Sequence, residues 1–386
     1  MNLQRSRKGS VIIMIMLFFL SLIILIFAFT NASKEIGVKG SVNSLGRLWA
    51  NSILGEFDIN LQGRYGLFGF YGFEKDISSK LDYYANYSFQ EKKYIDWGGC
   101  SCSLYDYSLG NPNNVKKQIV EVGKLNLVTK EDAAEQSQME DRDINNKKIL
   151  MSLPSSGMDN SLDLDKIGDT IKNLKSLEGI ATYGSEKFFI NTYIKNYFKN
   201  NINSKGLGET YFRNEMEYII GGNSKDRQNL SNVKIKIIAI RNVLNFAYLM
   251  TDETKKQEAI VAAQLITPGP VSLATQMAIL EGWALVESSR DYSSLIDGKK
   301  VPFMKTKETW GRDDNSEDEK GTYYEDYLMS LICFVDDNVK LLRIMDLIQI
   351  NMKFLYYGDF LISEYSSGLN YKMQVNGKNY EFNGEY

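Results

Sequence analysis

The chain has 386 residues, of which 24% are charged and 12% aromatic, and its formal net charge is −3. This composition is typical of a folded protein and not of a disordered one. No long run of Lys or Arg lies beyond the N-terminus, which argues against a nucleic-acid partner because phosphate neutralisation needs a basic face. Histidine is absent, so the commonest general base and the commonest zinc ligand are both missing.

A short basic leader, residues 1–10, precedes an apolar run over residues 11–29 whose only polar side chain is Ser21. A helix of this length spans roughly 28 Å, close to the hydrocarbon thickness of a bilayer. Because Lys and Arg mark the cytoplasmic flank of such a helix, we predict a single-pass anchor in the cell membrane, with the N-terminus in the cytoplasm and the rest outside. The alternative is a secretory signal cleaved near Ala32. The predicted lipid-facing residues include Val11, Ile15, Phe18, Leu22, Ile26 and Phe29.

The helical pattern continues outside the predicted membrane segment, over residues 30–56. Apolar residues recur there at helical spacing, at Val38, Val42, Leu45, Trp49 and Ile53. Small residues lie between them and permit close helix–helix approach: Gly37, Gly40, Ser41 and Ser44. The stripe can pack on the protein's own outer domain or on other helices, and both readings stay open.

We predict one α+β domain over residues 57–386, dominated by helices. Tyr, Trp and Ile over 81–108 indicate a β-rich early segment, whereas the polar stretch 129–165 is predicted to be a flexible insertion. The alternation around Asn376-Gly377 predicts a C-terminal hairpin with a type I′ turn. Helices are expected over 216–220, 233–250, 255–266, 273–287, 323–336 and 339–356, with a short strand at 301–305.

Candidate chemical sites in the sequence are few. The acidic loop 313–320 lacks the glycine and the final glutamate of an EF-hand, so we expect a solvated loop and leave cation binding open. Cys333 lies in an apolar stretch, and Cys100 and Cys102 lack the spacing of a zinc site. We therefore predict no catalytic residue, metal site or cofactor. An enzyme would have to use carboxylates in an arrangement that the sequence does not reveal.

Several longer blocks carry a resemblance. RKGSVIIMIMLFFL at the start, ILGEFDINLQGRYGLFGFYG, NEMEYIIGG and ILEGWALVESSRDYSSLIDGKKVPFMKTKETW resemble TadE/TadG-like, membrane-anchored proteins of an uncharacterised Gram-positive family found with Tad (Flp) pilus genes. The resemblance implies a minor-pilin-like or assembly component without an assigned activity. It also suggests leader cleavage between Gly9 and Ser10, but the fifth residue after that point is Met14, where a type IV pilin has glutamate.

From these observations we expect a non-enzymatic, pseudopilin-like structural or assembly component of a Tad-type (type IV-like) pilus or related surface apparatus. Its partners would be the lipid bilayer and other pilin-like or Tad assembly proteins. The alternative is a membrane-tethered binding or sensing module with a pocket lined by the Tyr/Trp-rich segment 83–107. A third hypothesis is an anchored hydrolase whose carboxylates converge in a cleft.

Overall fold

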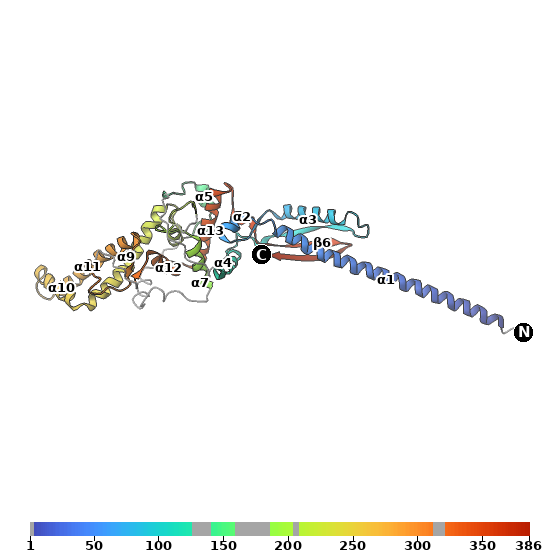
Figure 1. The fold of residues 1–386 in the computed structure, drawn as a ribbon, viewed down its shortest axis with the longest axis horizontal. Helices are drawn as coiled ribbons and strands as arrows, with labels where there is room; N and C mark the ends of the chain where they lie inside the picture. Colours follow the sequence, from blue (N-terminus) through green and yellow to red (C-terminus); the bar gives the residue numbers. More distant parts are fainter. Residues whose placement is uncertain (1–3, 126–139, 159–185, 204–207, 312–320) are drawn as a thin grey trace. The chain divides into compact units, whose positions relative to one another are not determined.

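The computed structural model describes residues 4–125, 140–158, 186–203, 208–311 and 321–386 (Figure 1). The chain divides into two compact units, described separately below. Unit 1 takes the residues up to 57 together with 69–108 and 366–386, and unit 2 takes 58–68 and 109–365. Residues 57–386, expected as one domain, are thus distributed over both units. The mixed α+β class with an N-terminal apolar helix is confirmed.

Unit 1 is built on a three-stranded antiparallel sheet in the order β2-β6-β7. In its register Cys102 lies opposite Tyr371, and Tyr371 lies opposite Phe382. Its elements are α1 (Gln4–Leu54), β1 (Phe70–Tyr71), α3 (Glu74–Phe89), β2 (Trp97–Ser103), a 3-10 turn (Tyr105–Tyr107), β6 (Gly368–Val375) and β7 (Lys378–Glu385). The short strand β5 (Tyr365–Ser366) precedes β6.

Helix α1 runs through the predicted membrane segment and its outer extension without a break, as the sequence predicts. The apolar stripe of the outer half is buried in the core of unit 1, where Val38, Val42, Trp49 and Ile53 are at most 6% exposed. Trp49 contacts the rings of Phe89 on α3 and Trp97 on β2. The packing of the stripe on its own domain is therefore confirmed.

The C-terminal hairpin β6–β7 is also confirmed. Asn376 and Gly377 both have positive φ, 51° and 72°, as a type I′ turn requires. The β-rich early segment expected over 81–108 is corrected in its first part, because α3 continues to Phe89, whereas the strand β2 does form within it from Trp97. The residues of α3 at helical spacing, Ile77, Leu81, Ala85 and Phe89, all face the core, and this burial outweighs the β preference of Tyr83 and Tyr84.

Unit 2 is helical. Its described elements are α2 (Ile59–Tyr65), α4 (Pro112–Leu125), α5 (Lys147–Ser152), α7 (Glu186–Tyr197), α8 (Glu215–Gly221), α9 (Asp226–Thr251), α10 (Glu253–Ile266), α11 (Ser272–Ile296), β3 (Val301–Pro302), β4 (Gly321–Thr322), α12 (Tyr324–Phe334), α13 (Asp337–Leu355) and a 3-10 turn (Ile362–Glu364). The helices predicted between 216 and 287 and between 323 and 356 are confirmed, and the short strand at 301 pairs with β4.

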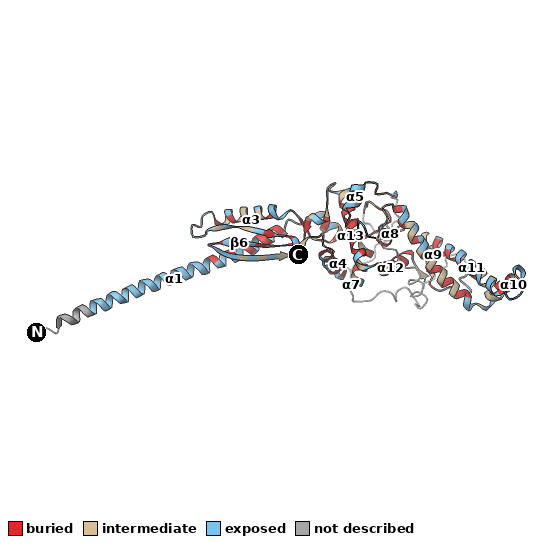
Figure 2. Ribbon diagram, turned by 180° about the vertical axis from the view of Figure 1, so that it is seen from behind, coloured by how far each residue is buried: buried red, intermediate tan, exposed pale blue. Residues whose placement is uncertain are grey.

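Helix α13 lies in the core of unit 2, and every residue from Val339 to Met352 is buried (Figure 2). Its N-terminus is capped by the Asp336 carboxylate, which accepts hydrogen bonds from two backbone N–H groups.

The prediction of a flexible insertion over 129–165 was wrong in its middle part, because Ile144 and Leu153 are buried in the core of unit 2. The apolar side chains in an otherwise polar stretch explain that packing. The remainder of the insertion lies outside the described residues.

Candidate functional site

The apolar half of α1 is the clearest functional feature of the chain. It is long and apolar enough to cross a membrane, and its apolar window has no burial inside the protein. The predicted lipid-facing residues Val11, Ile15, Phe18, Leu22, Ile26 and Phe29 are all exposed (Figure 2). An exposed apolar helix of this length in water would be unfavourable by several tens of kcal/mol at about 25 cal/mol per Å², so it needs an apolar environment such as lipid.

The outer half of α1 has two different faces. On the inner face, Gly46 lies against the ring of Phe382, and its carbonyl accepts a hydrogen bond from the Tyr371 hydroxyl at 2.6 Å. A Cβ at position 46 would come within 2.5 Å of that ring. The glycine therefore lets the helix backbone approach the sheet closely.

The small residues predicted for helix–helix contact lie mainly on the other face. Gly37 and Gly40 are exposed, and nothing lies within 4 Å of a Cβ built on either of them. Ser44 is exposed as well, whereas Ser41 is half-buried beside the inner face. Their contact with another helix stays a prediction, but the surface is open for it.

The predicted leader cleavage point and the acidic loop are two further candidate sites. Gly9 and Ser10, at the predicted leader cleavage point, lie within the first turns of α1. The acidic loop 313–320 lies outside the described residues. Leader cleavage and cation binding therefore stay predictions.

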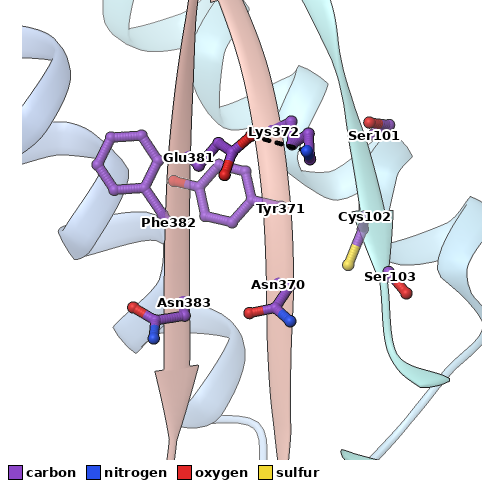
Figure 3. Close-up of a pocket in the computed structure, with 9 residues that line it drawn as sticks. All are labelled: Ser101, Cys102, Ser103, Asn370, Tyr371, Lys372, Glu381, Phe382 and Asn383. Carbon is purple, nitrogen blue, oxygen red and sulfur yellow. Dashed lines mark ion pairs between the residues drawn. The ribbon is translucent and has the colours of Figure 1, made fainter. Parts of the chain in front are cut away.

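The sheet of unit 1 has one covered and one open face. Helices α1 and α3 pack on the face that carries Leu369, Tyr371 and Met373, while β2, β6 and β7 together line a hollow of about 510 Å³ (Figure 3). The Lys372 ammonium on β6 and the Glu381 carboxylate on β7 pair between these neighbouring strands at 2.7 Å, with both side chains about two-thirds exposed (Figure 3). Exposed pairs of this kind contribute at most about 1 kcal/mol.

The chemistry of this hollow does not favour a nucleophile. Burial, followed by the charge of Glu74, raises the pKa of the Cys102 thiol to about 12, so the thiol stays protonated at neutral pH. From the Tyr/Trp-rich segment 83–107, only Ser101, Cys102 and Ser103 line the hollow. The Tyr and Trp side chains of that segment, which the binding-module alternative places around a pocket, do not line this hollow.

Sequence reasoning missed a group of buried carboxylates in unit 2, formed by Glu215, Glu217, Asp226 and Asp346. Each is at most 1% exposed. Burial raises the pKa of Glu217 to about 7 and those of Asp226 and Asp346 to about 6. The sequence held one signal for this burial. Glu215 and Glu217 lie two residues apart, and positions two apart point to opposite sides of a helix, so a short helix cannot expose both glutamates through one solvent-facing side.

The second missed feature is a buried ion-pair network that joins α9, α11 and the segment after β3. The Arg241 guanidinium pairs with the Asp291 carboxylate at 2.7 Å and donates to the backbone carbonyls of Pro302 and Phe303. Lys305 pairs with Asp291 at 2.8 Å and with Glu287 at 2.7 Å. Burial alone would raise the pKa of Asp291, but the Arg241 and Lys305 charges hold it below its usual value.

Neither group forms an accessible reactive centre. The network residues have partners on every side, which is the pattern of a structural brace. Among the described residues, no group of three or more Cys, Asp or Glu side chains could hold a metal ion. The clearest feature of the described residues is therefore the helix α1. Its first half is exposed and apolar, and its second half packs on the sheet of unit 1.

Comparison with known proteins gives one result. A family model described as a family of unknown function (DUF5702) matches residues 107–377, well over half of the chain. No curated protein and no solved structure matches significantly.

Proposed function

We propose that this chain, which belongs to the DUF5702 family of unknown function, is a non-enzymatic, pseudopilin-like structural or assembly component of a Tad-type pilus or related surface apparatus. Helix α1 would hold it in the cell membrane, with its N-terminus in the cytoplasm and its folded part outside. The partners would be the bilayer and other pilin-like or Tad assembly proteins.

One observation carries the proposal: α1 is a single helix whose apolar half is exposed and whose outer half is part of the core of unit 1. An anchor joined by a flexible linker would only tether a domain. A continuous helix instead fixes the membrane segment to the sheet, because Trp49 and Gly46 are held by Phe89, Trp97 and Tyr371. A force or displacement in the membrane segment would then pass directly to the outer fold.

The open face of α1 supports lateral assembly. Gly37 and Gly40 have free space around them and make no contribution to the core of unit 1. Helices that carry small residues on one face can bring their backbones close together. A neighbouring helix could therefore pack along this face without any change in the fold.

The test is co-purification of the full-length protein from detergent-extracted native membranes. We expect other membrane proteins of the apparatus to be recovered with it. Gly40→Leu should reduce this recovery because the leucine fills the open face, whereas Lys39→Leu, at the neighbouring exposed position of the same helix, should not. Recovery of the protein alone, or equal effects of the two variants, would contradict the proposal.

Orientation and processing are tested separately. Protease added to intact cells should digest the residues beyond about 31, and protection of that whole region would reverse the orientation. The intact mass of the extracted protein distinguishes the full-length chain from products cut after Gly9 or near Ala32.

A further inference from the structure

Two segments that are far apart in the sequence meet at one end of unit 1. They are the loop 90–96, between α3 and β2, and residues 376–379 at the turn of the β6–β7 hairpin. The Asn376 backbone N–H donates to the Asp96 carbonyl at 2.8 Å, and the Asn376 side-chain amide donates to the Tyr94 carbonyl at 3.2 Å. Figure 1 shows this end on the side of the unit from which the exposed half of α1 leaves. We call the two segments together the proximal end of unit 1.

An ion pair gives the height of the proximal end along α1. The Lys378 ammonium lies 2.8 Å from the Glu35 carboxylate, and α1 runs unbroken from the predicted membrane segment past Glu35. Glu35 follows Phe29, the last residue of that segment, by six residues, which is about 9 Å of helix. The headgroup layer extends roughly 5–8 Å beyond the hydrocarbon core on each side. The proximal end therefore begins at the outer edge of the headgroup layer.

The tilt of a membrane helix brings this end closer to the lipid. Membrane helices lie on average about 20° from the bilayer normal. Unit 1 packs on one side of α1, through the stripe from Val38 to Ile53, so a tilt toward that side lowers the proximal end into the headgroup layer. Because α1 is one continuous helix, the sheet follows the tilt of the membrane segment.

The chemistry of the proximal end matches an anionic lipid surface. Five lysines and three acidic residues lie in it and in residues 30–39 of α1, a net charge of +2, whereas the whole chain has −3. Lys93 is exposed and makes no ion pair with a residue that the structure describes, and Tyr94 is 51% exposed. Lysine next to a membrane segment is attracted to anionic lipids, and tyrosine is enriched at the membrane interface. The charged residues counted are Lys34, Lys39, Lys92, Lys93 and Lys378, with Glu35, Glu91 and Asp96 as the acidic ones.

We propose that the proximal end of unit 1 rests on the anionic lipid headgroups of the leaflet from which α1 emerges. Lys93 would face the headgroups, and the ring of Tyr94 would lie in the interface. The chain would then hold the membrane at two places, α1 and this end, and the second contact would fix the tilt of α1. The inference rests on the membrane anchor of the proposed function and not on the pilus role.

The experiment uses the full-length protein reconstituted in vesicles of mixed zwitterionic and anionic phospholipids. A fluorophore is attached to Tyr94→Cys, and its quenching by lipids that carry a short-range quencher on the headgroup is measured. The matched control is Tyr105→Cys, an exposed tyrosine beyond the other end of β2, a strand that spans roughly 23 Å at about 3.3 Å per residue. Wild type is the blank, because burial raises the pKa of all three native thiols.

We expect quenching at position 94 to be at least about threefold stronger than at position 105. Lys93→Glu should reduce the quenching at position 94 to about half or less, because a repelled charge replaces an attracted one. Lys75→Glu, at an exposed position in the first turn of α3, should leave it unchanged. Replacing the anionic lipid by a zwitterionic one should act like Lys93→Glu.

Two results would overturn the proposal. One is equal quenching at positions 94 and 105. The other is quenching at position 94 that responds neither to Lys93→Glu nor to the charge of the lipid, because closeness to the anchor alone would produce it. Either result, in a protein that stays in the vesicles through a sodium carbonate wash, would refute this inference alone. Release of the protein by that wash would refute the anchor, on which the proposed function also rests.

Discussion

Glu217 on α8 offers the sharpest test of the electrostatics of unit 2. Its side chain is fully buried. One carboxylate oxygen accepts hydrogen bonds from the Asn201 backbone N–H at 3.0 Å and the Tyr324 hydroxyl at 2.8 Å, and the other oxygen has no hydrogen-bond partner among the residues that the structure describes. Glu217→Gln keeps the size and the accepting oxygen but removes the ionisable group.

The expected effect follows from the pKa of Glu217, which burial raises from 4.5 to about 7. Each pKa unit corresponds to about 1.36 kcal/mol, so the ionised carboxylate lowers the free energy of unfolding by about 3 kcal/mol. The pKa of Glu217 is higher in the folded state than in the unfolded state. The stability that the protonated carboxyl group contributes is therefore fully present below about pH 4.5 and is lost as the pH rises through about 7.

Glu217→Gln should therefore gain about 3 kcal/mol of stability over wild type between acid pH and about pH 8. The assay is urea unfolding of the full-length protein in detergent across that pH range, read by hydrogen exchange of peptides from α8 so that unit 2 is followed alone. The solvent-exposed Glu140 provides the control, and Glu140→Gln should leave the pH profile unchanged. Parallel profiles for wild type and Glu217→Gln would refute the reasoning.

Three further results are expected from unfolding measurements on the same protein. Gly46→Val should cost about 1–3 kcal/mol by overpacking, and Phe382→Ala should recover part of that cost, whereas strictly additive effects would contradict the close contact. Trp49→Ala should cost about 3–5 kcal/mol in unit 1, while Leu48→Ala, at an exposed neighbouring position, should stay within about 0.5 kcal/mol; similar costs would refute the assignment of the inner face. Asp291→Asn should cost about 3–5 kcal/mol because the buried Arg241 loses its carboxylate partner and Lys305 loses one of its two, and a neutral result would show that the network is not a brace.

Some of this protein could be predicted from the sequence because the signals are local. The length and apolarity of residues 11–29 predict the exposed half of α1. The three- and four-residue spacing of apolar residues from Val38 to Ile53 predicts the buried face of its outer half. Asn376-Gly377 predicts the hairpin, because few residues adopt positive φ at two successive positions. These features depend on neighbours within a few residues.

The rest was decided by contacts between segments far apart in the chain. Helix α3 forms where aromatic residues suggested strands, because its apolar face packs on the sheet and α1. Glu217 is buried because Asn201 and Tyr324, which lie far from it in the chain, both contact its carboxylate. Periodicity indicates that a helix or strand has an apolar face. Only the tertiary structure decides what packs on that face, because its burial depends on which distant segment contacts it.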